Sequence, residues 1–401
     1  MAAIALSFLY ATGIIYFVEL ALALLGVPWN VWNVSLPALV IAVVVLVLTK
    51  PSFRWPRLTV VDALTFLTVV AYALYATVAR VWEWDFWAIW GLKARVFLEA
   101  HTIDWRFLGS RWNDFVHPDY PLLLPLNYVY TGLLGGGWND RWLGVVTVAF
   151  AAAFLLIVRE LVARETTPLI ASTITFAVTA FALSGFIGLA EAPLIAFAGA
   201  AILFLRRAIL LDDAVPMKHG ALLAGLAACT KNEGMALLVT IAVALAISKV
   251  RLVWRLWPAF AVALPWVVVR AIHRFPTDLA QGSFAARVLS RARSIGSVGE
   301  LLLRYLHAPW LWSVLLVALL VVPHRLRVRE RFVLLVFAFQ IAIYAVTYLG
   351  TPYTVEWQVA TSWPRLTAQI ASPLLVVVML MLARTFAPEH DLAHAEARSD
   401  H

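Results

Sequence analysis

The sequence predicts an all-α polytopic integral membrane protein. Of its 401 residues, 63% are apolar and only 13% are charged, whereas a soluble domain has roughly 45–50% apolar and ~25% charged residues. Apolar runs approaching the ~20 residues that a helix needs to cross a bilayer recur along the chain. A membrane-spanning barrel would instead show short strands with alternating apolar and polar residues.

The apolar runs predict about twelve spans, and an even number places both ends of the chain on the same side of the membrane. The first run contains Glu19 and is not preceded by basic residues, so we expect an uncleaved helix rather than a signal peptide. The predicted spans are 4–25, 32–49, 58–80, 142–163, 167–188, 192–211, 219–230, 234–249, 252–271, 309–323, 332–350 and 370–386.

The formal net charge of +8 comes largely from basic clusters in short connections between these spans. Cytoplasmic loops of membrane proteins are enriched in Lys and Arg, so we place Met1 and all the clusters on the cytoplasmic side. This explanation needs no nucleic-acid partner, and we expect none. The clusters are Lys50/Arg54/Arg57, Arg159/Arg164, Arg206/Arg207/Lys218, Lys249/Arg251/Arg255 and Arg325/Arg327/Arg329/Arg331.

The same topology leaves three longer segments outside, at 81–141, 272–308 and 351–368. Within the first, 121–136 is too short for a span, and we expect an amphipathic or re-entrant helix along the outer interface. The second external segment is rich in arginine, although external loops usually carry few Lys and Arg residues, and we expect it to bind an anion. The basic residues in and just before this segment are Arg270, His273, Arg274, Arg287, Arg291, Arg293 and Arg304.

The first external segment holds a candidate general base. Asp85 lies among tryptophans at the outer end of a span, where exclusion of water tunes the pKa of a carboxylate that accepts a proton from a hydroxyl. The alternative is that Trp84, Trp87 and Trp90 form an ordinary interfacial belt and that Asp85 faces the lipid headgroups. Further along, His-Pro-Asp-Tyr-Pro at 117–121 adds more polar candidates.

Two later segments place charged side chains within or beside apolar runs, where burying a charge in the membrane costs free energy. Lys231 and Glu233 interrupt the apolar stretch 220–248, and ionisable residues inside a membrane usually line a functional site. The alternative is a tight external turn in which Gly234 supplies the turn geometry. Arg365 follows a polar run and is placed to clamp a phosphate with its guanidinium, although snorkelling to the headgroups would also explain it.

The order of these features resembles the GT-C membrane glycosyltransferases, in particular the glycosyltransferase family 39-like group of protein O-mannosyltransferases and lipid A aminoarabinose transferases. An acid opens the first external loop, a Pro-rich segment follows, Glu191 stands in the second external turn, and Thr-Lys-Asn-Glu-Gly at 230–234 breaks an apolar run. The likeness covers about 58–270. It implies inverting transfer from a polyprenyl-phosphate sugar at the outer face of a bacterial inner membrane.

The resemblance assigns roles residue by residue. Asp85 matches the first-loop acid of the family, which is the general base, and Glu191 matches the second-loop acid. The segment at 117–121 stands where the family has a Lys-Pro-Pro-type segment near the carrier phosphate. Two departures are that Phe86 replaces a second acid and that the lysine of Lys-Pro-Pro is absent, so other cations must bind the phosphate.

The resulting site prediction has three groups of residues. We expect catalytic roles for Asp85, Asp119 and Glu191; donor-phosphate binding by Lys231, Arg365, His117 and Arg270; and a substrate pocket of Trp84, Trp87, Trp90, Lys93, Tyr120 and Glu233. The corresponding organisation is an N-terminal transmembrane hairpin (1–57), a GT-C-like catalytic module (58–271), a C-terminal transmembrane region (272–386) and a disordered cytoplasmic tail (387–401).

Cofactors and the acceptor stay open at this stage. Some GT-C enzymes use a divalent ion, and His273 or His307 could bind one together with Asp85 or Glu191, although no His-x-x-x-His spacing supports this. The expected partners are the lipid-linked donor, membrane lipids and a glycan, lipid or protein acceptor. A transporter or flippase is the main alternative, and a non-catalytic subunit is a third; no internal repeat typical of transporters is visible.

Overall fold

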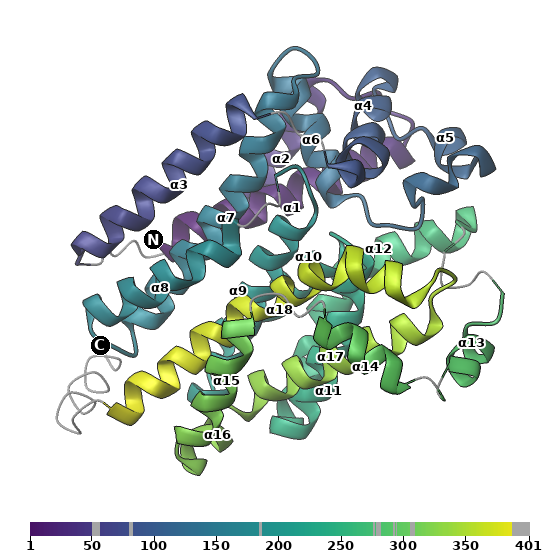
Figure 1. Cartoon of the computed structure of the whole chain (residues 1–401). Coiled ribbons are helices and arrows are strands. Elements are labelled where there is room, and N and C mark those ends of the chain that lie inside the picture. Colours follow the sequence, from purple (N-terminus) through teal and green to yellow (C-terminus); the bar gives the residue numbers. More distant parts are fainter. Residues whose placement is uncertain are drawn as a thin grey trace.

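The computed structural model confirms the all-α fold. It describes residues 1–49, 57–79, 83–183, 187–275, 277, 282–291, 293, 295–304 and 309–386, and the regular structure in these ranges is helical without strands (Figure 1). Seven helical stretches there are long and apolar enough to cross a membrane. The predicted tail 387–401 lies outside the described residues.

Seven candidate spans are fewer than the twelve predicted. Some predicted spans form helices shorter than a bilayer requires, such as α8 (Pro168–Leu183), α10 (Ala214–Ala228) and α15 (Pro309–Val321). Two others, α11 (Asn232–Lys249) and α12 (Trp257–His273), are joined through η3 (Val250–Leu256) in one helical stretch. Apolar run length alone therefore overestimated the number of full crossings.

The N-terminal half is a layer of long helices. The α3 helix starts at a capping box between Thr59 and Asp62, and Asp62 also accepts a 2.7 Å hydrogen bond from Arg159 on α7. This pairing attaches α3 to the bundle by a polar contact at its first turn. The long helices of this half are α1 (Ala2–Leu24), α2 (Val31–Thr49), α3 (Val60–Val78), α7 (Asp140–Ala163) and α9 (Glu191–Leu211).

The first predicted external segment folds into short helices. The longest of them is α6 (Leu123–Leu134), whose residues are mostly buried and which packs against α1 and α4. The short helix was predicted, but an amphipathic surface helix was not confirmed, because Tyr128 and Asn127 are buried along with the leucines. The other helices are η1 (Phe86–Trp90), α4 (Gly91–Ala100), α5 (Trp105–Gly109) and η2 (Arg111–Val116).

The C-terminal part corrects one prediction. The stretch 351–368 was expected to be an external loop, but 355–368 form the first half of the 32-residue helix α18 (Val355–Phe386), shown in yellow in Figure 1. Pro364 and Pro373 lie inside this helix without ending it. The remaining helices are α13 (Phe284–Arg291), α14 (Ile295–Arg304), α16 (His324–Arg329) and α17 (Arg331–Gly350).

Helices α9 and α18 pack together. They run in the same direction, because Glu191 lies beside Arg365 while Arg206 and Arg384 both contact Glu165. Glu191 is the first residue of α9 and Arg365 lies within the first half of α18, and each helix has an arginine near its end. At 1.5 Å per residue these positions are ~22 Å apart on α9 and ~28 Å apart on α18, close to the ~30 Å thickness of a bilayer core. The two helices therefore carry a charged region toward each end, and the apolar stretch between these regions is about as long as the bilayer core is thick.

The far end of this pair is a buried ion cluster. Arg206 donates hydrogen bonds of 2.6 Å to both Glu165 and Glu330, and Arg384 donates one of 2.6 Å to Glu165. The amino group of Met1 lies 3.1 Å from Glu160, near the same place. The two described ends of the chain therefore lie at one end of the bundle, away from Glu191.

Candidate active site

Charged side chains from three distant segments meet at the start of α9, beside the first half of α18. Asp85 lies just before the π-helical turn η1, and its carboxylate accepts a hydrogen bond from Nη1 of Arg365. The same nitrogen lies 3.7 Å from Oε1 of Glu191, whose side chain is fully buried. One guanidinium is therefore shared between two predicted catalytic acids.

Lys231 extends this chain of charges. Its Nζ lies 2.9 Å from Oε1 of Glu191 and 2.9 Å from Oε1 of Glu233. Burial alone would lower the pKa of Lys231, but the two carboxylates outweigh burial and raise the pKa above its ordinary value. The amine is therefore a fixed cation at neutral pH. The sequence predicted that these charges would lie near one another, and the structure brings them together.

The neighbouring residue, Asn232, holds the third predicted acid. Its Nδ2 donates a 2.7 Å hydrogen bond to Oδ2 of Asp119, and Nη2 of Arg270 lies 3.9 Å from the same oxygen. The backbone oxygen of Asp119 accepts a 3.2 Å bond from the indole of Trp266. Three consecutive residues, 231–233, thus connect the acids of the first external segment to the acid at the start of α9.

Close packing fixes the turn at 230–234. A Cβ on Gly234 would lie 2.0 Å from the backbone oxygen of Ala227, so only glycine fits there. Gly234 lies within α11, and the reason for glycine is therefore this close approach rather than the turn geometry proposed as the alternative. The amide of Leu123 donates to the backbone oxygen of Cys229 at 3.1 Å, which brings the His-Pro-Asp-Tyr-Pro segment to the turn.

A cavity of about 180 Å³ opens beside this cluster. On one side it is lined by Asp119, Tyr120 and the two residues after Lys231. On the other side it is lined by polar side chains of α17 and α18, so both halves of the chain contribute to it. Its polar lining residues are His117, Asp119, Tyr120, Asn232, Glu233, Thr277, Tyr344, Thr347, Tyr348, Thr351, Tyr353, Gln358 and Ser362.

Several buried acceptors at the cluster have no hydrogen-bond donor within the described part of the chain. They are Oε2 of Glu191, Oδ1 of Asn232 and Oε2 of Glu233. Leaving a buried acceptor unsatisfied costs about 1–3 kcal/mol, and a bound water, ion or ligand commonly satisfies such groups. A ligand with several hydroxyl donors would satisfy these oxygens.

The predicted aromatic pocket is only partly present. Trp84 and Trp87 are 75% and 47% exposed and do not line the cavity, which fits an interfacial belt. Trp90 is buried and stacks on Tyr120, with ring centroids 5.6 Å apart. Lys93 is also buried, behind the cavity wall, and its Nζ donates a 2.9 Å hydrogen bond to the backbone oxygen of His117.

Burial strongly perturbs Lys93 in the first external segment. Burial lowers the pKa of Lys93 to about 7, and the nearby Asp119 carboxylate offsets only part of this effect. The amine also lies over the rings of Trp90 and Tyr120, 5.4 and 5.8 Å from their centroids. It therefore changes charge in the neutral pH range beside a wall of the cavity.

Two arginines of the Arg-rich segment contact the chain itself. Nε of Arg287 donates to the backbone oxygen of Gly350 at 2.7 Å, and Nη1 of Arg291 donates to that of Thr351 at 2.7 Å. Both arginines thus bind carbonyl groups at the end of α17, where cations complement the helix dipole. Arg270 is the residue of this group that reaches the cluster, through Asp119.

A metal site is not apparent among the described residues. No three His, Cys, Asp or Glu side chains within these ranges are grouped to hold an ion. His273 stacks between Trp105 and Phe275, at centroid distances of 4.4 and 5.2 Å, and His307 lies outside the described residues. Glu19 is buried and contributes only its backbone oxygen to a hydrogen bond, from Trp29.

Several site residues were not predicted. Asn232 and Trp266 both hold Asp119, and Tyr344 and Tyr348 line the cavity. A signal for the tyrosines was present, because Gln340, Tyr344 and Tyr348 recur every four positions along α17 and so share one face. Polar groups along one face of an apolar helix indicate that this face points into the bundle.

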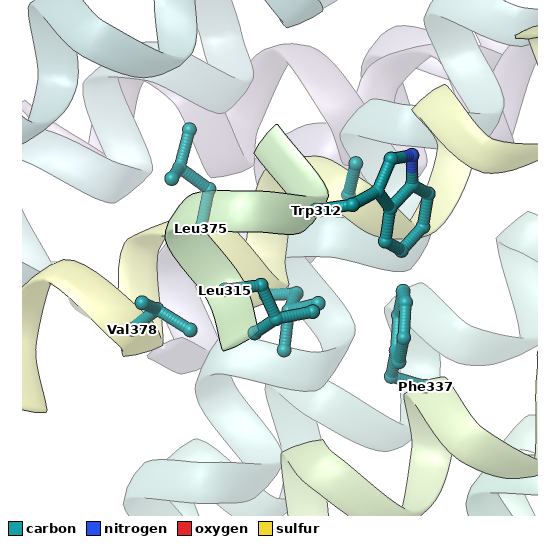
Figure 2. Close-up of a pocket in the computed structure, with 7 residues that line it drawn as sticks. Trp312, Leu315, Phe337, Leu375 and Val378 are labelled. Carbon is teal, nitrogen blue, oxygen red and sulfur yellow. The ribbon is translucent and has the colours of Figure 1, made fainter. Parts of the chain in front are cut away.

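A second hollow is entirely apolar. Figure 2 shows it between α15, α17 and α18, with Trp312, Leu315, Phe337, Leu375 and Val378 around it. Its volume is only about 10 Å³, too small to hold more than about one water molecule. It is a packing gap beside α18 rather than a binding site.

Comparison with protein-family models, curated proteins and solved structures finds no match to this chain. The functional argument therefore depends on the residues themselves. The cluster offers carboxylates as candidate proton acceptors, cations that can stabilise an anion, and unsatisfied acceptors that can bind hydroxyl groups.

Proposed function

We propose that the chain is an inverting GT-C-type glycosyltransferase that moves a sugar from a polyprenyl-phosphate donor to a hydroxyl acceptor. The observation that supports this most directly is the chain of contacts from Asp85 through Arg365, Glu191 and Lys231 to Glu233, which reaches a polar cavity. It combines a candidate base with cations suited to a leaving phosphate.

In this proposal Asp85 is the general base. The acceptor oxygen attacks the anomeric carbon as the bond from that carbon to the phosphate oxygen breaks. The acceptor proton passes to the Asp85 carboxylate, and the electron pair leaves with the phosphate. Arg365 and Lys231 stabilise the charge that grows on that phosphate, and this stabilisation is larger in the transition state than in the ground state.

Because Arg365 pairs with Asp85, binding of the donor would also change the surroundings of the general base. A donor phosphate competes with Asp85 for the guanidinium, because both are anions that suit bidentate binding. Capture of Arg365 by the phosphate would release the carboxylate of Asp85 toward the acceptor. The base would then become available only when the donor is in place, which would limit reaction with water.

We further propose that the cluster faces the outer side of a bacterial inner membrane and that both chain ends face the cytoplasm. The basic residues support this orientation, because Arg159, Arg206, Lys249 and Arg331 contact partners at the end of the bundle opposite Glu191. The helices α4, α5 and α6 would then form the membrane-parallel part of the first external segment.

A direct test uses the full chain in lipid nanodiscs. We expect it to bind a polyprenyl monophosphate, the leaving group of the proposed reaction, more tightly than the neutral polyprenol. Mass spectrometry of glycans and lipids from cells with and without the protein should show one sugar missing from one acceptor. Binding without any lost glycan, together with movement of the lipid across the membrane, would instead favour a flippase.

A further inference from the structure

A larger cavity, of about 420 Å³, lies at the end of the bundle away from the candidate active site. Arg207, which lines it, follows Glu191 by sixteen residues on α9, a rise of ~24 Å along the helix. The walls come from α1, α2, α7, α9 and the start of α10. The apolar lining residues are Ala2, Ala3, Leu6, Ala11, Ile14, Ala42, Val45, Leu161, Phe204, Val215 and Pro216.

The charged rim of this cavity includes Arg207, whose charge Glu165 and Asp213 attract without a direct contact. Arg207 is half-buried, and its guanidinium forms no hydrogen bond or ion pair with the described part of the chain. Arg164 lines the same cavity and is close enough to Arg207 for their charges to repel. Two neighbouring guanidinium groups around an accessible space are a typical arrangement for binding a phosphate.

The acids at the rim are already engaged. Glu160 accepts a 2.6 Å bond from Arg164 and one of 2.6 Å from the amide of Ala2. Asp213 caps α10 by accepting a 2.9 Å bond from the amide of Val215. Tyr10 and His219, which also line the cavity, share a 2.7 Å hydrogen bond. Asp213 and Glu165 attract Arg207 through space, but no acid among the described residues accepts a hydrogen bond from its guanidinium, so Arg207 can still donate to an incoming anion.

We propose that this cavity binds an anionic glycerophospholipid, with its phosphate between Arg207 and Arg164 and an acyl chain along α1 and α2. The apolar walls distinguish a lipid from a soluble anion, because a free phosphate would gain nothing from Leu6, Ile14 and Val45. The position also suits a lipid of the leaflet nearest the chain ends. The proposal is independent of the glycosyltransferase proposal, since no residue is shared.

The experiment measures lipid binding by native mass spectrometry of the detergent-purified full chain. Phosphatidylglycerol should bind more tightly than phosphatidylcholine, and Arg207→Ala should weaken phosphatidylglycerol binding at least about tenfold, the value expected for one lost charge-assisted contact. Ala42→Trp should weaken it as well without changing any charge, because it obstructs the wall on α2. Arg207→Lys should fall between the wild type and Arg207→Ala.

The matched control is Arg251→Ala, an exposed cation on η3 that does not line the cavity. Equal loss in Arg251→Ala and Arg207→Ala would mean non-specific attraction and would overturn the proposal. It would also be overturned if phosphatidylcholine bound equally well, if Ala42→Trp had no effect, or if millimolar inorganic phosphate displaced the lipid completely.

Discussion

The guanidinium of Arg365 donates to the carboxylate of Asp85, although the two residues are 280 positions apart in the sequence. Because Nη1 of Arg365 also lies 3.7 Å from Glu191, this side chain joins the first external segment, α9 and α18 at one point. The pair links a candidate base to a candidate phosphate ligand, and substitutions on either side should therefore have distinguishable effects.

The first prediction concerns Asp85→Asn. Asparagine keeps the size of the side chain and loses the proton acceptor, so the rate of transfer should fall ~10²–10⁴-fold. Donor affinity should not fall, and should rise if the phosphate competes with Asp85 for Arg365. The measurement is turnover of a lipid-linked sugar donor, together with binding of a polyprenyl monophosphate.

The control for Asp85 is Glu83→Gln, two residues away and exposed, which should retain activity. If Asp85→Asn keeps its turnover and Asp119→Asn or Glu191→Gln loses it, the base is one of those residues instead. Activity in all three variants would exclude the proposed general-base chemistry.

The second prediction concerns Arg365→Ala. Loss of the guanidinium removes a cation from the proposed leaving phosphate, so both kcat and donor affinity should fall, with the larger effect on kcat/KM. Arg95→Ala is the control, because Arg95 is exposed and pairs only with Glu99 on its own helix. Unchanged kinetics in Arg365→Ala would place the phosphate elsewhere.

The sequence predicted the candidate site best where charged residues occur in apolar surroundings. Lys231 was selected because ionisable groups inside a membrane are costly unless they pair or line a cavity. Asp85 and Arg365 were selected for their positions at the membrane interface, and Glu191 through the family resemblance; the four residues do lie together. Their partners were harder to find, because an amide such as Asn232 is neutral and is common in turns.

The sequence misled where polar composition was interpreted as a loop. Residues 351–368 include threonines, serine, glutamine and Pro364, and we expected an external loop, yet most of them form α18. Gln358 and Ser362 face a polar cavity rather than solvent, so their polarity reports a site inside the bundle. The excess of predicted spans has a different source, namely the short apolar helices α8, α10 and α15 and the joining of α11 to α12 in one helical stretch.

The third prediction uses Gly234→Ala. Although alanine favours a helix by up to about 1 kcal/mol, its Cβ would lie 2.0 Å from the backbone oxygen of Ala227, and overpacking of this kind costs about 1–3 kcal/mol. We expect a lower Tm and weaker donor binding, because the 231–233 side chains move with the turn. Gly296→Ala, on α14 with open space around it, should leave Tm equal or higher.

The fourth prediction tests the ion cluster at the far end. Arg206→Met would leave Glu165 and Glu330 facing each other in the interior, with Arg384 as their remaining cation. Removing one partner of a buried ion network typically costs about 3–5 kcal/mol, so Tm should fall sharply. Arg95→Met, which breaks an exposed pair, should cost no more than about 0.5 kcal/mol; equal shifts would contradict a structural role for the cluster.

The fifth prediction concerns the pH dependence of stability at Lys93. Burial lowers the pKa of Lys93 from 10.5 to about 7 in the folded protein, while the unfolded chain keeps the ordinary value. Between these two values the unfolded state binds more protons than the folded state, so the free energy of unfolding rises with pH across that window. The gain is at most about 1.4 kcal/mol per pH unit.

The comparison that isolates this effect is Lys93→Met, which keeps an apolar stem over Trp90 and cannot titrate. Its Tm relative to the wild type should be highest near pH 6, where the wild type must bury a charged amine, and should decline steadily between pH 7 and 9.5. Lys249→Met, at the far end and partly exposed beside Asp212, should follow the wild-type profile. A constant difference in Tm between Lys93→Met and the wild type over this range would show that Lys93 has the same protonation state in the folded and unfolded protein. Its hydrogen bond to the backbone oxygen of His117 would then come from a permanently charged ammonium group.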